Sequence, residues 1–417
     1  MSLDYEIYPL KKLNEGASVF SGFAFKSNDF SDEGIPIVKI KNIQNKSVDL
    51  KEVQYFPLDK VNNKHKKFFL KNNDVLIAMT GQGSLGRVGR INLESNEYVL
   101  LNQRVGKFVV DEKNLHLNYL YHVISSDMYE KILFDRGTGS GQPNLSPEII
   151  LGTEIPMPNL TIQKKISSIL DNINSKITLN KKINKNLEKT LITIFNSWFI
   201  NFENYDNSKR MKIDDSYGEI PVDWSVEMLE DYVDFVTGVE PGSKNYHEKP
   251  EPNDIPFLRV GDLGSRDNGV FIDPSLSKNK ILKYDDIVLS LDATIGIVKM
   301  GLEGAYSTGM RKLVIKNDNI NQPFLYCLVK SNRIQRIIET FATGTTILHA
   351  GKSIKHMNFV LSDKKTMDDF GKIGNPIISI ILTNLKEIEY LTNLRDTLLP
   401  KLMSGEIDVS KINCDLE

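Results

Sequence analysis

Two glycine-containing segments have the residue types of a phosphate-binding loop. Gly81-Gln82-Gly83-Ser84-Leu85-Gly86 fits the G-x-G-x-x-G pattern and follows an apolar run. A dinucleotide site needs a helix directly after this pattern, but Arg87-Val88-Gly89-Arg90-Ile91 is typical of a strand. Gly351-Lys352-Ser353 has the residues that end a P-loop, but Thr346 stands where the earlier glycine is required. We interpret the first segment as a turn or groove-facing loop and exclude a P-loop.

Other patterns that commonly support catalysis are absent from the sequence. The six histidines have no metal-ligand spacing, and no G-x-S-x-G turn occurs. The chain has no Pro-Pro dipeptide, which excludes a signature of amino-methyltransferases, and it lacks the Pro-Asp and Glu-x-Lys parts of a common nuclease signature. We therefore expect no catalytic residue, no metal and no cofactor in this chain. The alternative is that the chain is a methyltransferase or endonuclease with an unrecognised active site, or the specificity region of such an enzyme.

Polar residues that suit DNA recognition gather in the loops between the predicted strands. Arg, Asn and Gln can read base edges in pairs, Lys and backbone amides hold phosphates, and glycine lets the backbone approach a groove. A solvated loop has a similar composition, so the loops together, and not single residues, carry the prediction. The candidates in the first half are Lys39, Lys41, Thr80, Gln82, Ser84, Arg87, Asn102, Gln103, Arg104, Arg136, Thr138, Ser140 and Gln142. Those in the second half are Arg259, Asp262, Arg266, Asp292, Thr294, Thr308, Arg311, Thr343, Thr345 and Lys352.

These loops lie in two similar halves of the chain. Five segments of the first half recur in the second: 35–40 as 255–260, 74–77 as 286–289, 86–89 as 296–299, 103–105 as 310–312, and 118–121 as 323–326. Each half then closes with a Gly/Thr-rich loop, residues 136–144 in the first and 342–346 in the second. The same order of six features makes chance a poor explanation. The apolar runs are short and β-branched, and short helices interrupt them. Each half is therefore predicted to be a mixed α/β unit of about 150 residues, within the usual range for a domain.

A long helix is predicted after each half. Apolar residues or asparagine recur every seven residues, at Ile166, Ile173, Asn180, Leu187 and Ile194, and again at Phe370, Ile377, Asn384, Leu391 and Leu398. Offset-three positions hold Ile169, Ile183, Ile373, Ile380 and Leu394, a pattern typical of a coiled coil. Pro376 is expected to kink the second helix or to mark its start.

The two helical segments carry opposite charges. Residues 159–205 hold 7 Lys and Arg against 3 Asp and Glu, and residues 366–417 hold 5 against 9, so their net charges are +4 and −4. We predict antiparallel pairing, with Asn180 and Asn384 at one level to fix the register and Lys176 near Glu387. The alternative is two separate amphipathic helices, each packed on its own domain.

Length and composition limit the class of protein. At about 150 residues per domain, 417 residues predict two or three domains. A content of 40% hydrophobic and 25% charged residues is typical of a globular chain, and no apolar run reaches membrane-spanning length. The two cysteines cannot form a disulfide framework, so a reducing cytoplasm is expected. A net charge of −2 excludes a globally basic nucleic-acid binder but not a local basic surface.

Three segments resemble the specificity subunit (HsdS) of type I restriction–modification systems. Residues 155–166, from Ile155-Pro156-Met157-Pro158 to Ile166, are similar to the family's entry into its central conserved helix, with departures at Met157, Asn159 and Ile162. Residues 218–224 resemble the start of a second recognition domain. Residues 394–407, from Leu394-Arg395-Asp396 to Gly405-Glu406-Ile407, are the most specific match. The second half has Val360-Leu361-Ser362 in place of a Pro-x-Pro entry.

The resemblance implies an α+β fold with two pseudo-repeated target recognition domains, 1–158 and 206–365. They would be separated by two long antiparallel coiled-coil helices, 159–205 and 366–417. Each domain would read one half of a bipartite, asymmetric double-stranded DNA target, and the helix pair would set the spacer. Two modification (HsdM) subunits would carry S-adenosylmethionine, and restriction (HsdR) subunits would join for cleavage. The family also implies that Trp198, Phe199 and Phe202 contact the modification subunit.

Overall fold

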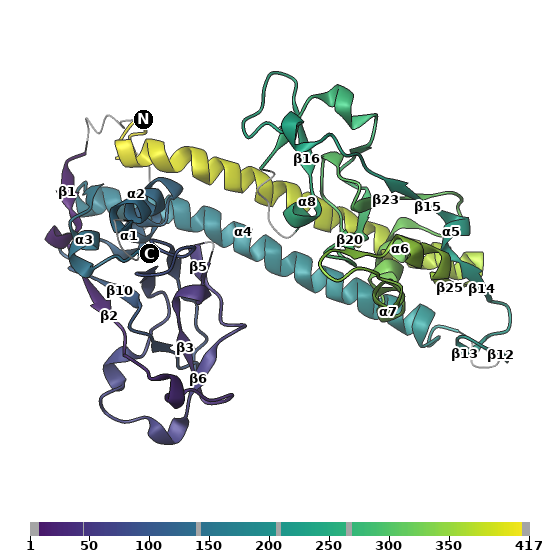
Figure 1. Ribbon diagram of the computed structural model, residues 1–417, viewed down its shortest axis with the longest axis horizontal. Helices are drawn as coiled ribbons and strands as arrows, with labels where there is room; N and C mark the ends of the chain where they lie inside the picture. The colour runs from purple at the N-terminus through teal and green to yellow at the C-terminus, as the bar shows by residue number, and fades with distance from the viewer. Residues whose placement is uncertain (1–7, 45, 139–142, 206–209, 264–268, 411–417) are drawn as a thin grey trace. The chain divides into compact units, whose positions relative to one another are not determined.

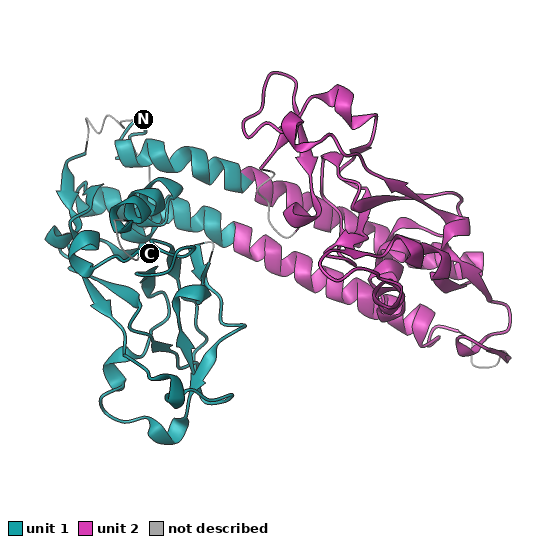
Figure 2. Cartoon of the chain, in the orientation of Figure 1, with its two compact units in different colours: residues 1–176, 391–417 teal, residues 177–390 magenta. Residues whose placement is uncertain are grey.

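Two long helices connect the α/β parts of the molecule. In the computed structural model, which describes residues 8–44, 46–138, 143–205, 210–263 and 269–410, α4 spans Leu160–Phe195 and α8 spans Lys364–Ser404. The chain divides into two units, residues 1–176 with 391–417 and residues 177–390 (Figure 2). Each unit therefore contains a segment of α4 and a segment of α8.

The first unit is built on a six-stranded and a three-stranded sheet (Figure 1). The larger sheet has the order β2 (Ala17–Ser21), β10 (Val105–Val110), β7 (Val75–Ala78), β8 (Val88–Arg90), β5 (Lys46–Val48), β4 (Ile43–Gln44). The smaller has the order β6 (Gln54–Phe56), β3 (Ile35–Val38), β9 (Leu100–Leu101), and β1 (Leu10–Lys12) pairs with β11 (Glu154–Pro156). The short helices are α1 (Leu117–Ile124), α2 (Asp127–Gly137) and α3 (Pro147–Leu151).

The second unit has two four-stranded sheets and three strand pairs. One sheet has the order β15 (Val233–Thr237), β23 (Met310–Ile315), β19 (Ile287–Ser290), β21 (Val298–Lys299), and the other β17 (Phe271–Ile272), β16 (Ile255–Leu258), β22 (Gly304–Tyr306), β18 (Ile281–Leu282). The pairs are β12 (Met211–Asp214) with β13 (Gly218–Pro221), β14 (Ser225–Met228) with β25 (Asn358–Leu361), and β20 (Asp292–Ala293) with β24 (Leu348–His349). The short helices are α5 (Leu229–Tyr232), α6 (Gln322–Lys330) and α7 (Asn332–Thr340).

The strand order confirms the predicted repeat. The order β2-β10-β7-β8 in the first unit matches β15-β23-β19-β21 in the second. The parallel pair β3–β9 matches the parallel pair β16–β22, and the antiparallel pair β1–β11 matches β14–β25. Helices α1 and α2 likewise match α6 and α7 in chain order. The two halves therefore share one topology as well as the sequence motifs.

The strand register corrects one part of the predicted alignment. Val105 lies opposite Ala78, and Met310 lies opposite Ser290, the residue equivalent to Ala78 in the repeat. Val105 is therefore equivalent to Met310, and the predicted match of Arg104 with Arg311 is wrong by two residues. Arg104 precedes β10, whereas Arg311 is the second residue of β23. The sequence alignment failed here because both arginines follow similar polar turns.

The corrected register also places one ion pair at the same position in both units. Lys107 Nζ lies 3.3 Å from a carboxylate oxygen of Asp74, and Lys312 Nζ lies 2.6 Å from one of Asp286. All four side chains are mostly buried. Removing one partner would leave a mostly buried charge uncompensated, which is why such pairs lock strands that belong together. Each pair joins the central strand β10 or β23 to the start of β7 or β19.

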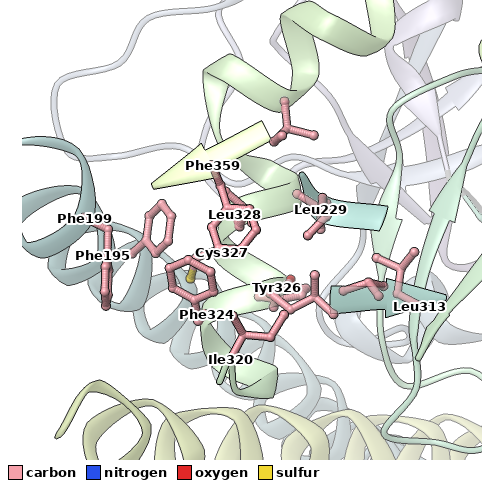
Figure 3. Close-up of a cluster of buried hydrophobic side chains, with 14 of the residues drawn as sticks. Phe195, Phe199, Leu229, Leu313, Ile320, Phe324, Tyr326, Cys327, Leu328 and Phe359 are labelled. Atoms are coloured by element: carbon pink, nitrogen blue, oxygen red, sulfur yellow. The ribbon is translucent and has the colours of Figure 1, made fainter. Parts of the chain in front are cut away.

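Both long helices contribute to the core of each unit. In the second unit, Leu191 and Phe195 of α4 and Phe370 of α8 belong to one buried cluster with Phe324 of α6. Figure 3 shows part of this cluster, with Phe195 and Phe199 beside Phe324 and Cys327. In the first unit, Ile166 and Leu170 of α4 share a cluster with Leu399, Leu402 and Met403 of α8. Apolar burial of this kind is the main stabilising contribution to folding.

Antiparallel pairing of α4 and α8 is confirmed within each unit (Figures 1 and 2). Amides make polar contacts across the pair. In the first unit Arg395 donates to Asn174 at 3.1 Å. In the second unit Asn180 donates to Glu387, and Asn384 to Asn184, both at 2.7 Å. The alternative of two separate helices is wrong.

The predicted register of the pair is wrong by about one helical turn. Asn384 meets Asn184 and not Asn180, and the partner described for Asn180 is Glu387. The offset-three residues Ile183, Ile373 and Ile380 are exposed, so the buried stripe does not follow a strict heptad. The reason is that each helix also packs against an α/β domain, which widens and rotates its apolar face. Pro376 does not mark the start of α8, which begins twelve residues earlier at Lys364.

The Asn184–Asn384 contact predicts an energetic coupling between the helices. Asn384→Leu removes the donor to the Asn184 carbonyl oxygen and should lower the free energy of unfolding by about 1 kcal/mol. Adding Asn184→Leu replaces both polar partners by apolar groups and should recover part of this loss, since it also removes the bond that Asn184 donates to Ile381 O. Urea unfolding of the single and double variants measures the coupling. The exposed Asn186 is the control, because Asn186→Leu with Asn384→Leu should be additive; additivity for Asn184 would contradict the contact.

Candidate nucleic-acid interface

Four polar loops of the first unit meet at one edge of its sheets. Backbone hydrogen bonds connect them: Asn102 N donates to Val38 O at 3.1 Å, Met79 N to Arg104 O at 3.0 Å, and Leu145 N to Met79 O at 2.8 Å. These bonds bring together the loops after β3, after β7, before β10 and after α2. The predicted loop residues of this half are therefore neighbours in space.

The second unit repeats these three bonds. Ser307 N donates to Leu258 O at 2.9 Å, Leu291 N to Gly309 O at 2.9 Å, and Ala350 N to Leu291 O at 2.7 Å. The loops after β16, after β19, before β23 and after α7 are held together in the same way. Backbone bonds of this kind position a loop without depending on its side chains. The side chains of these loops can therefore differ between the two units while the framework stays the same.

Glycine is required at one equivalent position of both frameworks. A Cβ atom on Gly22 would lie 2.3 Å from Leu101 O, and one on Gly238 would lie 2.1 Å from Tyr306 O. These distances are too short for any real Cβ contact, so a glycine is required directly after β2 and after β15, where the chain passes the loop before β10 or β23.

The first unit presents a cluster of cations at this edge. Burial and the neighbouring charges of Lys41 and Arg104 lower the pKa of Lys39. The Lys39 ammonium lies 3.5 Å from the centre of the Phe30 ring and donates to Gln54. Lys41 and Arg104 are exposed. Three cations this close repel one another, and an anion such as a phosphate would relieve that repulsion.

Several predicted residues of this half have structural roles. Asn102 is buried, and its side-chain oxygen accepts from the backbone N–H of Arg104. Arg136 donates to the carbonyl of Gly152 and so lies against the segment before β11. Thr80 forms an antiparallel bridge with Asn144, and its hydroxyl is buried without a hydrogen-bond partner among the described residues. Neither Asn102 nor Arg136 is thus presented as a free side chain.

The remaining candidates of the first half lie on the loops with varied exposure. The exposed ones are Gln82, Arg87, Gln103 and Thr138. Ser84 is half-buried, and its hydroxyl donates a hydrogen bond to Thr80 O. Ser140 and Gln142 lie outside the described residues. The Thr138 hydroxyl donates to Asp135 O at 3.2 Å, whereas the exposed amides of Gln82 and Gln103 and the guanidinium of Arg87 have donors or acceptors of the kind that reach base edges.

The corresponding edge of the second unit contains a mixed-charge group. Burial lowers the pKa of Arg311 despite the nearby charge of Asp292, and its guanidinium donates to the carbonyls of Thr308 and Met310. His349 Nδ1 lies 2.7 Å from Asp292 Oδ1 across the β20–β24 pair. A rigid guanidinium beside a carboxylate–imidazole pair offers both donors and acceptors to a base edge.

Arg259 is already paired inside its own turn. Its Nε and Nη2 donate to the two carboxylate oxygens of Asp262 at 3.0 and 3.1 Å. This fork-like pair raises the pKa of Arg259 and fixes its orientation. Thr294, Thr308, Thr343, Thr345 and Lys352 are exposed, and Arg266 lies outside the described residues.

Sequence reasoning missed two residues of these edges. Asn144 pairs with Thr80, and His349 with Asp292, at equivalent places of the two units. Asn144 was inside the predicted loop 136–144, so its amide could have been chosen. His349 lies beyond the predicted loop 342–346, and only the strand pairing shows that it reaches Asp292. In the described part of the chain, no group of three His, Cys, Asp or Glu side chains could hold a metal ion.

A buried polar cluster fastens the first α/β domain to α4. His122 Nε2 lies 2.9 Å from Asp171 Oδ1, and Arg90 donates to the same oxygen at 3.2 Å. Asn118 donates to the second oxygen at 2.8 Å, and the Arg90 guanidinium lies 3.9 Å from the Tyr121 ring centre. Burial raises the pKa of Asp171, but the hydrogen bonds and charges of His122 and Arg90 outweigh it and hold this pKa below its usual value. Burial lowers the pKa of His122 despite Asp171, so the neutral ring donates to the carboxylate.

The lowered His122 pKa predicts a loss of stability in mild acid. The unfolded chain binds this proton below pH about 6.5 and the folded chain only at lower pH, so the free energy of unfolding should fall as pH drops from 7 to 5. The slope from one such group is at most about 1.4 kcal/mol per pH unit. His122→Gln should be less stable at pH 7 but should decline less steeply. His116→Gln is the matched comparison, because burial also lowers the pKa of His116. If the stability of His122→Gln falls with pH as steeply as that of the unmodified chain, the prediction is wrong.

Of the three aromatic residues predicted to contact a partner, Phe199 is buried, whereas Trp198 and Phe202 are partly exposed. Phe199 is buried in the core, and Trp198 packs against Phe370, so Phe199 is not available to another chain. Phe202 lines a groove of about 860 Å³. The groove is lined by apolar residues such as Ile192 and Ile337 and by the basic residues Lys330, Arg333 and Arg336.

Exposed apolar residues lie instead along the helix pair of the second unit. We call Leu179, Ile183, Ile373 and Ile380 the apolar ridge; Ile183 is 36% and Ile380 47% exposed. At about 100° of rotation per residue, Leu179 and Ile183 lie on the side of α4 opposite Glu188, which accepts a hydrogen bond from α6. Ile373 and Ile380 lie on the side of α8 that faces away from Lys386, whose ammonium lies over the Tyr284 ring. An exposed apolar patch of this kind is typical of a protein–protein contact.

Comparisons with known proteins agree on one family. The family model for the type I restriction modification DNA specificity domain matches residues 5–189 and 221–396. The specificity subunit of the type I restriction enzyme MjaIX of Methanocaldococcus jannaschii is 29% identical over 319 residues, covering 73% of this chain and 72% of that protein. That of HindI of Haemophilus influenzae is 22% identical over 408 residues, covering 81% and 87%.

A solved structure shares the fold. The crystal structure of the type I restriction–modification S subunit from M. genitalium matches with a TM-score of 0.56 and 18% identity, covering 95% of this chain and 96% of that one. Within the described ranges, every helix is too short or too polar to cross a bilayer.

Proposed function

Because the chain belongs to the type I restriction modification DNA specificity family, we propose that its two repeated domains each read one half of a bipartite DNA target. The observation that carries this proposal is the repeat of the loop framework, with three equivalent backbone bonds holding different side chains in each unit. Similar frames with different side chains suit an asymmetric target, because base edges are discriminated by the donors and acceptors presented to them. The helix pair would set the spacer between the half-sites.

In this proposal the chain is the non-catalytic part of a larger enzyme. Its relatives are specificity subunits of type I restriction enzymes, which supports assembly with catalytic chains. Two modification subunits would bind S-adenosylmethionine and methylate adenine, restriction subunits would join for cleavage, and the complex would act on DNA in the cytoplasm. This chain would contribute the sequence choice.

The apolar ridge is the surface that we assign to the modification subunits. It lies on the helices away from the loops, so a partner there would leave the reading edges free. Its aliphatic side chains would be buried on association, a favourable contribution of about 25 cal/mol per Å² of apolar surface that the entropy cost of association partly offsets. The ridge thus takes the place of the buried Phe199, while the partly exposed Trp198 and Phe202 stay candidates for the partner contact.

Arg104 and Arg311 predict separate effects on the two half-sites. Substituting either residue by alanine in the assembled complex should weaken target binding by about 1–3 kcal/mol if it contacts a base. Sequencing of the methylated sites should show relaxation in one half for Arg104→Ala and in the other half for Arg311→Ala. The exposed Lys212 of β12 is the control. An equal loss on all DNA would assign the arginine to phosphate anchoring, and relaxation of both halves by one variant would contradict the proposal.

A charge on the apolar ridge should prevent assembly. Ile183→Asp combined with Ile380→Asp places two carboxylates in the proposed contact, and burying them unpaired is strongly unfavourable. Co-purification with the modification subunit should be lost while the isolated chain stays folded, and its melting temperature checks this, because a moderate decrease is expected from residues that are only 36% and 47% exposed. Ile213→Asp, at a residue 75% exposed on β12, is the matched control. Normal assembly of the double variant would exclude this surface.

A further inference from the structure

One loop of the second unit has an exposed aliphatic tip. It runs from Thr343 to His349, whose backbones are joined by two hydrogen bonds of 3.0 and 2.8 Å. Within it Ile347 is 55% exposed. The adjacent Leu348 is 37% exposed, so the tip presents two neighbouring aliphatic side chains to solvent, and exposed apolar groups that lie together are typical of a binding surface.

The loop is held rigidly before any ligand binds. Gly344 has φ of +107°, and a Cβ there would lie 2.1 Å from Ile347 O, so the turn admits only glycine. His349 pairs with Asp292 and Leu348 with Ala293, a non-glycine residue at φ +60°. Ala350 N then bonds Leu291 O, which anchors the end of the loop in the core. Ordering this loop on binding would therefore cost little entropy.

The tip belongs to the loop group proposed to read DNA. His349 contacts Asp292, and Arg311 Nη2 lies 3.7 Å from the position of a Cβ on Gly351. The polar members of this group can satisfy the donors and acceptors of a base pair. The major-groove edge also carries one apolar group, the C5-methyl of thymine, and besides the small methyl groups of the threonines only an aliphatic side chain such as Ile347 offers this group of loops an apolar surface for it.

We propose that Ile347 reads thymine in the half-site of the second domain by contacting its C5-methyl group. The inference rests on the proposed function of this edge and adds a specific base contact to it. Isoleucine suits this role because its β-branched side chain has one strongly preferred χ1 rotamer and presents a stiff apolar surface. Because the tip lies beside polar residues such as Arg311 and His349, the methyl contact and the hydrogen bonds to the bases could form in one bound position.

Replacing thymine by deoxyuridine tests the contact, because it removes only the methyl group. The assembled complex would be titrated with its target duplex, carrying deoxyuridine at each thymine of that half-site in turn. Wild type should bind about fourfold more weakly at one position, as expected for one apolar carbon withdrawn from contact. Ile347→Ala should bind the thymine duplex more weakly and should not respond to deoxyuridine at that position. Ile347→Val should keep part of the response, and Ile213→Ala should keep all of it.

Three results would overturn the inference. The Ile347→Ala complex could respond to deoxyuridine as wild type does, it could lose affinity equally on target and unrelated DNA, or the half-site could contain no A·T pair. The second result would make Ile347 a non-specific wedge. A wild-type complex with no preference for its target over a scrambled duplex would instead overturn the proposed function together with this inference.

Discussion

The packing of α4 against α8 is the constraint on which the other features depend. In each unit the two helices share a core cluster with the α/β domain, so neither domain could bury its apolar face without them. The asparagine contacts between the helices, Asn184–Asn384 among them, are directional hydrogen bonds that oppose sliding of one helix along the other.

Each α/β domain is fastened to α4 by a carboxylate of that helix. In the first unit Asp171 accepts from His122, Arg90 and Asn118. In the second unit Glu188 accepts from Tyr326 and Lys330, and although burial raises the pKa of Glu188, these hydrogen bonds and the Lys330 charge hold it below its usual value. A half-buried carboxylate with two or three donors has a defined geometry and is costly to break. The domains are thus attached through directional contacts as well as through apolar packing.

The loops combine a fixed backbone with variable side chains. Backbone hydrogen bonds and the close approach at Gly22 and Gly238 are common to both units, and the ion pairs Lys107–Asp74 and Lys312–Asp286 lock the strands beneath them. The side chains above differ: a cation cluster in one unit and a mixed-charge group in the other. This separation explains how one topology can serve two different half-sites.

The sequence by itself determined the repeat, the two long helices, their antiparallel pairing and the family. These features rest on short-range patterns, such as apolar periodicity and recurring motifs, that are visible without coordinates. Tertiary structure decided which residues within the patterns face which partners. It moved the partner of Asn384 from Asn180 to Asn184, separated Arg104 from Arg311, buried Asn102 and Phe199, and exposed Ile347. The reason is that a heptad specifies a stripe but not its register, and loop composition does not specify the strand pairing that brings His349 to Asp292.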